Sequence, residues 1–198
     1  MKIVVCIKQV PDTTEVKLDP KTGTLIRDGI PSIMNPDDKG GLEYALQLKD
    51  EYGAEVTVIT MGPPQADAVL REAFAMGADR AILLTSRKFA GADTLATSNA
   101  LAGALKVLDF DLVLAGRQAI DGDTAQVGPQ IAEHLGIPQV SYLEDLKFDG
   151  KKTLRIKKQL EDGYQVVEVD TPCLLTCLAS AVKPRYMSVN GIMEAWNK

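Results

Sequence analysis

The sequence predicts an α/β fold in which a mainly parallel sheet is covered by helices on both faces. Short runs that are apolar at nearly every position alternate with helical patterns, as in parallel strands buried between helices. Two of these runs follow the same joint, a helix end and then Gly-Ala-acid, at residues 53–55 and 77–79. Each glycine is the residue expected at a helix C-cap, so the joints indicate successive βα units.

Composition indicates one globular chain. Its 198 residues are 45% hydrophobic and 25% charged, which is enough to bury a substantial core. A net charge of -5 gives no electrostatic reason to bind nucleic acid or an anionic membrane. The apolar run at residues 3–7 is too short for a signal peptide core or a membrane span, so we expect a cytoplasmic protein without membrane insertion. Three cysteines and one histidine give little support for disulfides, a metal site or a catalytic triad.

The first third of the chain predicts a strand, an excursion and a helix. Residues 2–10 form an apolar run that predicts a buried strand. Two turn signals within residues 12–30 predict an extended hairpin outside the core. Asn35 is the predicted N-cap of the next helix and Pro36 suits its first position, so we expect a helix that runs to about Tyr52.

The later elements follow from the same patterns. We expect strands at residues 56–61, 81–84, 111–115 and 139–143, and helices at residues 64–76, 91–108 and 124–135. The pattern then changes, because residues 144–178 alternate in polarity and predict an antiparallel hairpin followed by a last strand at 173–177. A short amphipathic helix at 188–198 carries apolar side chains that need a partner surface or further chain. We predict a single α/β domain at residues 1–187.

Residues 116–129 follow a predicted buried strand and hold several Gly and Asp residues. Asp123 and Gln126 have the spacing of a capping box, which predicts a helix start there. Uncovered amides at a helix start, together with the positive end of its dipole, form a natural seat for a phosphate. The alternative is an ordinary βα turn, since such turns recur in every α/β sheet.

The carboxyl ends of the predicted parallel strands should meet on one rim, where such sheets bind ligands. These ends are residues 6–8, 61–63 and 116–118, and Asn35 is expected nearby. The rim has no general base beside a nucleophile, no metal cluster, and neither of the common glycine-rich phosphate-loop motifs. It therefore favours holding a nucleotide over hydrolysing or transferring it.

Six motifs occur in the order in which they stand in the β subunit of electron transfer flavoprotein, which the chain resembles over essentially its whole length. They lie at residues 8–12, 35–38, 61–63, 75–80, 116–128 and 183–186. The resemblance implies a Rossmann-like, doubly wound fold of the adenine-nucleotide-hydrolase-like type, paired with a homologous α subunit. It also implies a heterodimer that relays electrons between NADH or flavin dehydrogenases and an acceptor, with a redox-active FAD mainly on the α side.

By position, the resemblance assigns nucleotide contacts to the strand ends, the helix start and the Gly/Asp loop. The residues are Cys6, Asn35, Pro36, Asp37, Asp38, Met61, Gly116, Arg117, Gln118, Ala119, Ile120, Asp121, Gly122, Asp123, Thr124, Ala125, Gln126 and Val127. The occupant is AMP in ordinary members, and in electron-bifurcating members a second FAD that exchanges hydride with NADH. The sequence Asp-Gly-Asp-Thr-Ala-Gln resembles that of the electron-bifurcating members. Arg117 is the expected cationic neighbour of phosphate or flavin.

The resemblance also assigns a partner-binding segment, made of Ala181, Val182, Lys183, Pro184, Arg185 and Tyr186. In the family a leucine before Pro-Arg-Tyr enters partners such as the acyl-CoA dehydrogenases, but Ala181 stands at that position here. The family continues beyond the final helix with an arm that embraces the α subunit, whereas this sequence stops at Lys198. The alternative function is a stand-alone AMP or ATP sensor of the universal-stress type. That sensor would need a glycine-rich loop ending in Gly-Ser or Gly-Thr, a form that residues 116–128 lack.

Overall fold

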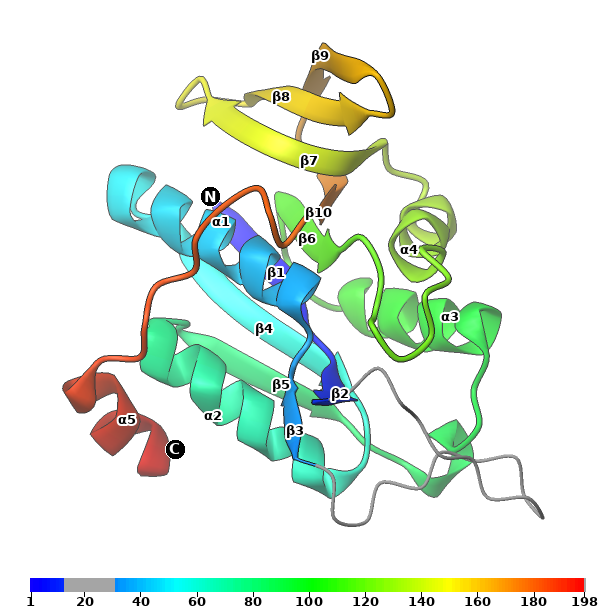
Figure 1. The fold of residues 1–198 in the computed structure, drawn as a ribbon, viewed down its shortest axis with the longest axis vertical. Helices are drawn as coiled ribbons and strands as arrows, with labels where there is room; N and C mark the ends of the chain where they lie inside the picture. The colour runs from blue at the N-terminus through cyan, green and yellow to red at the C-terminus, as the bar shows by residue number, and fades with distance from the viewer. Residues whose placement is uncertain (13–30, 198) are drawn as a thin grey trace.

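The structure is a computed structural model that describes residues 1–12 and 31–197 (Figure 1). The predicted hairpin excursion of residues 12–30 lies almost wholly outside the described residues. Eight strands form one sheet in the order β5-β4-β1-β6-β10-β7-β8-β9. Their bounds are β1 (Lys2–Cys6), β4 (Glu55–Met61), β5 (Arg80–Leu84), β6 (Leu112–Gly116), β7 (Gln139–Phe148), β8 (Thr153–Leu160), β9 (Gly163–Asp170) and β10 (Cys173–Cys177). A small antiparallel pair, β2 (Gln9–Pro11) and β3 (Ser32–Met34), lies beside it.

The sheet confirms the predicted fold class. The six strands from β5 to β7 in this order pair with one another in parallel. Strands β8 and β9 extend the sheet beyond β7 as an antiparallel hairpin. The chain adds β4 and β5 on one side of β1 and β6 on the other. Such a sheet is doubly wound, and its ligand crevice is expected where the strand order reverses, at the carboxyl ends of β1 and its neighbours.

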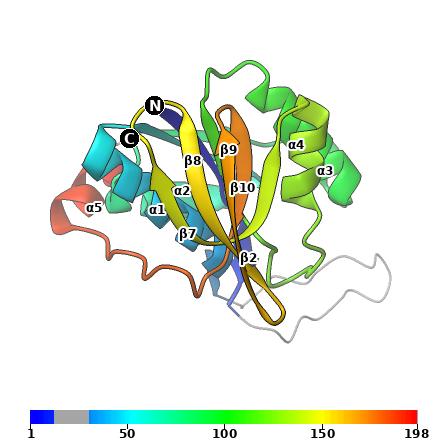
Figure 2. The ribbon, with the colours of Figure 1, turned by 90° about the horizontal axis from the view of Figure 1, so that it is seen from above.

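Helices cover both faces of the parallel strands. Figure 2 shows α1 (Pro36–Tyr52) and α2 (Asp67–Met76) on one face, with α3 (Thr94–Leu105) and α4 (Val127–Leu135) on the other. Two short 3₁₀ turns, η1 (Pro64–Ala66) and η2 (Arg87–Phe89), precede α2 and α3. Two clusters of buried apolar side chains fill these layers, one under α1 and α2 and one under α3 and α4. Within the described ranges, no helix has the length and apolar content that crossing a bilayer requires.

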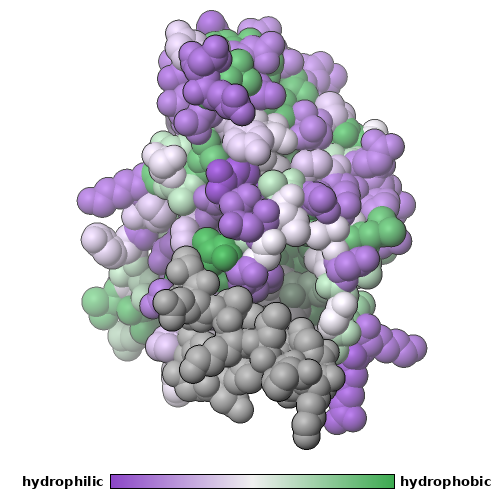
Figure 3. Space-filling model, turned by 45° about the vertical axis from the view of Figure 1, so that its right-hand side comes forward, coloured by the Kyte–Doolittle hydropathy of each residue, from purple (hydrophilic) through white to green (hydrophobic). Residues whose placement is uncertain are grey.

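The last helix and the hairpin lie at the periphery. Helix α5 (Val189–Trp196) packs against α2, at the opposite side of the molecule from the hairpin (Figure 1). The hairpin at the top of that view has a largely hydrophilic surface (Figure 3). The predicted division of the chain at residue 187 stays a prediction.

The predicted strand at residues 2–10 is wrong in one respect, because it divides into β1 and β2. The break falls at Lys8, whose N–H donates to the Asp38 carboxylate at 2.8 Å and whose C=O accepts from the N–H of Asn35 at 2.9 Å. A backbone that is bonded to the start of α1 is not available to continue a sheet ladder. The strand end is therefore turned toward the helix that the next motif begins.

Helix α1 begins and ends as predicted. Pro36 is its first residue, and Gly53 follows its last turn with a left-handed φ of 68°. Gly40 and Gly41 let the helix lie against the end of β10, since a Cβ atom on residue 40 would be 3.1 Å from the carbonyl oxygen of Leu178. The first turns of α1 are thus fixed directly on the rim of the sheet.

Candidate functional site

The rim of the sheet brings together three of the motifs that the sequence places far apart. Strands β1 and β6 are neighbours, with Cys6 beside Ala115, and both end under the first turn of α1. The loop of residues 117–126 leaves β6 at this point and leads to α4 (Figure 1). We call residues 117–126 the rim loop.

Asn35 holds the rim loop and does not cap the helix with its side chain, so the predicted side-chain cap is wrong. Its Nδ2 donates to the carbonyl oxygen of Gln118 at 2.8 Å, and its Oδ1 accepts from the N–H of Ile120 at 3.2 Å. The residue is fully buried and forms no side-chain cap bond. The side chain thus satisfies one backbone acceptor and one backbone donor of the loop.

Asp38 joins the ends of β1 and β6. One carboxylate oxygen accepts from the N–H of Lys8 at 2.8 Å and the other from the N–H of Gly116 at 2.9 Å. Burial raises the pKa of the Asp38 carboxyl to about 7, although both N–H donors favour the charged form. Its negative charge therefore costs free energy, which the Asn35 side chain and these two backbone bonds offset in part.

Asp37 joins the rim loop to the end of β10. Its Oδ1 accepts from the N–H of Ala179 at 2.8 Å, and its Oδ2 accepts from the N–H of Gln118 at 3.3 Å. The Nε of Arg117 lies 3.4 Å from the same Oδ2, and the guanidinium lies 6.0 Å from the ring centroid of Tyr142. Arg117 therefore points toward α1 and β7.

The acidic side chains of the rim loop have partners inside the protein. The ammonium of Lys8 lies 2.6 Å from Asp121, and the amide of Gln118 donates to Asp123. The N–H groups of Gly122 and Asp123 both donate to the carbonyl oxygen of Ala119. The loop is a folded turn in which Asp121 is paired with a cation and Asp123 is held by a neutral amide.

The predicted capping box of Asp123 and Gln126 is wrong. Helix α4 begins at Val127, three residues later than expected, and Gln126 precedes it without a side-chain cap bond. Asp123 and Ala125 have positive φ angles of 52° and 53°, which a right-handed helix cannot contain. The Gln126 amide oxygen accepts instead from the hydroxyl of Thr94 on α3, at 3.0 Å.

The later helix start leaves a run of backbone donors open. In the described parts of the chain, no acceptor receives a hydrogen bond from the N–H groups of residues 124–128. Residues 122–124 are exposed, and a Cβ atom on Gly122 would meet nothing within 4 Å. Left-handed residues beside right-handed ones form concave backbone surfaces that bind anions. The geometry therefore suits a phosphate more closely than a standard capped helix would.

The remaining predicted contacts lie around this surface. Pro36 is the first residue of α1, and Cys6 and Met61 stand at the carboxyl ends of β1 and β4. Both belong to the side of the sheet that α3 and α4 cover. Burial, with a smaller effect of Asp38, raises the pKa of the Cys6 thiol to about 12, so this sulfur is an inert part of the core.

The predicted partner-binding segment divides into an anchored part and an open part. Ala181 and Val182 pack against the core under α1. Arg185 binds the buried carboxylate of Glu43 through its backbone N–H and Nε, both at 3.0 Å, and through Nη2 at 3.1 Å. Tyr186 is 87% exposed, and the following α5 exposes Met187, Val189, Ile192, Met193 and Trp196 at or near its surface.

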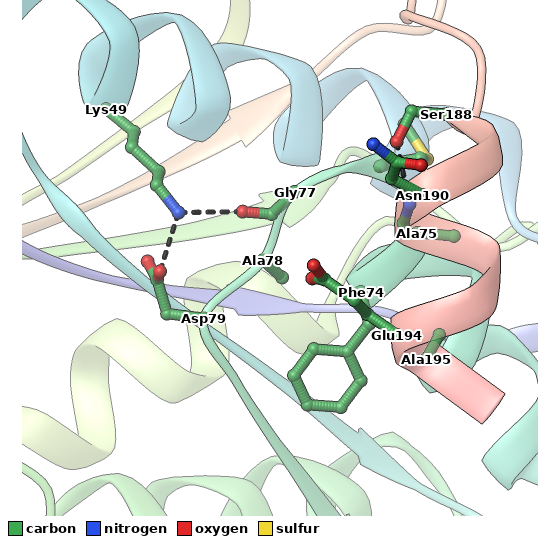
Figure 4. Close-up of a pocket in the computed structure, with 12 residues that line it drawn as sticks. Lys49, Phe74, Ala75, Gly77, Ala78, Asp79, Ser188, Asn190, Glu194 and Ala195 are labelled. Carbon is green, nitrogen blue, oxygen red and sulfur yellow. Dashed lines mark hydrogen bonds and ion pairs between the residues drawn. The ribbon is translucent and has the colours of Figure 1, made fainter. Parts of the chain in front are cut away.

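A cavity of about 410 Å³ lies away from the rim, between α5 and the carboxyl end of α2 (Figure 4). Lys49 donates there to the carbonyl oxygen of Gly77 and to the carboxylate of Asp79, and Glu194 of α5 faces the same space. None of the predicted nucleotide contacts lines it. The lining comes from residues 49, 74–79, 188, 190–191 and 194–195. The rim loop, by contrast, is an open surface.

Three residues of the site were not among the predicted contacts. They are Lys8, which neutralises Asp121, Ala179, which binds Asp37, and Tyr142, which lies under Arg117. Tyr142 has a φ of 62°, a rare value for a large side chain. Lys8 belongs to the first motif and to a strand end already expected on the rim, whereas nothing local in the sequence marks Ala179 or Tyr142.

Comparison with known proteins identifies the family. Residues 22–198 match the family described as "Electron transfer flavoprotein domain". The chain is 66% identical to the electron transfer flavoprotein subunit beta of Clostridium acetobutylicum, over its full length and 76% of that protein. It is 63% identical to the caffeyl-CoA reductase-Etf complex subunit CarD of Acetobacterium woodii, over its full length and 76% of that protein. It is 55% identical to the acryloyl-CoA reductase electron transfer subunit gamma of Anaerotignum propionicum, over its full length and 75% of that protein.

Proposed function

Because this chain belongs to the electron transfer flavoprotein β-subunit family, we propose that it relays electrons as one half of a heterodimer with an α subunit, and that its rim loop binds an adenine nucleotide. These relatives favour an electron carrier over the stand-alone sensor. The observation that carries the nucleotide proposal is the run of open N–H groups at residues 124–128, beside the paired charges of the loop.

The rim loop fits the phosphate groups of a nucleotide. Five consecutive backbone N–H groups supply donors without any side chain, and the positive end of the α4 dipole lies behind them. Lys8 pairs with Asp121, so the negative charge of that carboxylate is compensated beside the site. Gly122 leaves the surface open to close approach. The strained φ angles of Asp123 and Ala125 are typical of a ligand-binding turn.

The bound nucleotide in this proposal is FAD, and AMP is the alternative. Both carry an adenosine phosphate, so the contacts of the rim loop are the same for the two. The preference for FAD rests on the sequence of residues 121–126, which resembles that of the electron-bifurcating members. When bound, the flavin supplies the redox chemistry, and NADH is the proposed hydride donor.

The protein residues hold and orient the nucleotide. The amides of residues 124–128 hold the phosphate, and Lys8 pairs with Asp121 of the loop. Asn35 and Asp37 fix the rim loop, and Asp38 fixes the end of β6 that precedes it. Arg117 lies toward β7, with its guanidinium over the ring of Tyr142. The proposed second partner is a flavin-containing dehydrogenase or reductase. Two of the relatives carry the names of reductase complexes, which supports such a partner. Residues 181–186 are the segment that the family resemblance assigns to it.

A substitution in open space tests the nucleotide site. Gly122→Val adds a branched side chain where nothing of the protein lies within 4 Å, so the fold should tolerate it while the phosphate approach is blocked. Gly163→Val is the matched control, because residue 163 is equally open and lies at the start of β9. Each variant would be co-expressed with an α subunit, and the nucleotide released from the purified complex would be counted.

We expect Gly122→Val to lose the nucleotide of the β subunit while Gly163→Val retains it. Full nucleotide content in Gly122→Val would contradict the assignment to the rim loop. A complex that never contains a nucleotide in its β subunit would contradict the proposal as a whole.

A further inference from the structure

The carboxylate of Asp37 lies between two segments that the chain separates by about sixty residues. Its Oδ2 accepts from the N–H of Gln118 in the rim loop, at 3.3 Å, and its Oδ1 accepts from the N–H of Ala179, at 2.8 Å. Ala179 is the second residue after β10 and begins the chain that leads to α5. We call residues 179–188 the exit segment.

The exit segment is fixed to the same helix a second time. Arg185 binds Glu43 through three donors, one and a half turns further along α1. Glu43 is only 4% exposed, so this ion pair is a firm attachment. Between the two anchors, the backbone of Leu178 lies against Gly40. Helix α1 therefore supports the rim loop at its first turn and the exit segment along its next turns.

We propose that Asp37 is a positioning residue that couples nucleotide occupancy of the rim loop to the order of the exit segment. The inference rests on the proposed nucleotide site. A phosphate on the amides of residues 124–128 would restrict the rim loop, including the N–H of Gln118. A restricted Gln118 holds the Asp37 carboxylate in one orientation, so the N–H of Ala179 binds at a smaller cost in conformational entropy.

The coupling is reciprocal. A partner that orders the exit segment raises the affinity of the rim loop for its nucleotide by the same factor. The outer part of the exit segment is open to such a partner, since Tyr186 is 87% exposed and Met187 is 46% exposed. The carboxylate thus links a ligand surface to a surface on which the chain presents large side chains.

Hydrogen exchange measured by mass spectrometry tests the coupling without an identified partner. The full chain is compared with and without saturating AMP, whose binding is established in parallel by calorimetry. In the wild type, AMP should slow amide exchange of the exit segment by about fivefold or more. This comparison needs no variant and remains decisive if a substitution prevents folding.

Two variants assign the effect. Asp37→Asn keeps the size of the side chain but replaces one acceptor by a donor, so it can satisfy only one of the two N–H groups. Its affinity for AMP is measured first, and exchange is compared at saturating AMP, where the response of the exit segment should disappear. Asp50→Asn is the matched control, because Asp50 meets the exit segment through Arg185 at 2.8 Å and is not bonded to the rim loop within the described structure. It should keep the wild-type response.

The outcomes separate this inference from the proposed function. A wild type that binds AMP while exchange of the exit segment stays unchanged overturns the coupling and leaves the nucleotide site standing. An Asp37→Asn variant that keeps the full response overturns the role of Asp37. A wild-type chain that binds neither AMP nor FAD, alone or with an α subunit, overturns the proposed function and the coupling with it.

Discussion

Gly116 lies so close to the first turn of α1 that a Cβ atom on it would stand 2.8 Å from the Cβ of Asp37. The N–H of the same glycine donates to Asp38 at 2.9 Å. The end of β6 and the start of α1 are therefore in direct backbone contact, and the orientation of the rim loop follows from that contact.

Gly116→Ala should destabilise the fold by about 1–3 kcal/mol, because the added methyl group meets α1 backbone that packing holds in place. Urea denaturation of the purified chain measures the loss. Gly163→Ala is the control, since an added Cβ there meets nothing within 4 Å. Equal stability losses in the two variants would show that the contact at residue 116 relaxes without cost.

Arg185→Ala should destabilise the fold by about 2 kcal/mol, because it leaves the buried carboxylate of Glu43 without its charged donors. Asp50→Asn removes only the outer, more exposed partner of the same arginine and should cost less than about 0.5 kcal/mol. Thermal or urea unfolding of both variants gives the comparison. A stability loss in Asp50→Asn as large as that in Arg185→Ala would contradict the view that Glu43 is the main partner of Arg185.

The Asp38 carboxyl predicts a pH dependence of stability. Burial raises its pKa from 3.8 to about 7, so between these values the folded chain keeps a proton that the unfolded chain releases. The contribution of this carboxyl to the free energy of unfolding is complete below pH 3.8 and is lost as the pH rises through about 7. Asp38→Asn cannot titrate, so its free energy of unfolding should not show that loss.

Denaturation curves of the wild type and Asp38→Asn at several pH values between 4.5 and 8 measure this difference. The stability of the wild type relative to the variant should fall across that interval. Parallel pH profiles would contradict the raised pKa.

The strained turn of the rim loop gives a further prediction. Ala125 has a φ of 53°, which disfavours any residue with a Cβ atom, so Ala125→Gly should stabilise the chain by about 0.5–1 kcal/mol. Ala119→Gly is the control in the same loop. Since φ at residue 119 is not positive, that variant should be destabilised by a similar amount. Unfolding midpoints that move together would contradict the assignment of strain to Ala125.

The regular elements could be predicted because their signals are local. Pro36 and Gly53 mark the two ends of α1, and the apolar runs mark β4, β5, β6 and β10. The errors at Asn35 and at Asp123–Gln126 share one physical cause. Asn and Asp are both good local caps. Asn35, however, binds loop backbone that lies more than eighty residues away along the chain. At Asp123 and Ala125 the same loop has left-handed φ angles and so cannot be helical there. A capping pattern reports only what neighbouring residues can do.

The meeting of the motifs could be predicted from the sequence, but the hydrogen-bond partners of their side chains could not. The motifs at residues 35–38 and 116–128 do meet, as the strand-end argument requires. However, the side chains of Asn35, Asp37 and Asp38 are bonded to the protein itself, which no local pattern reveals. The donors left for a ligand are backbone amides, and they are left because α4 begins only at Val127.

The most direct test of the account is the nucleotide content of the heterodimer. The chain would be co-expressed with an α subunit, and the nucleotides released from the purified complex would be identified by mass spectrometry and counted. The account predicts two FAD per heterodimer, one of them lost in Gly122→Val. One FAD with one AMP would keep the rim loop as a nucleotide site but contradict its assignment to flavin. A stable lone chain that binds ATP and associates with no α subunit would contradict the account.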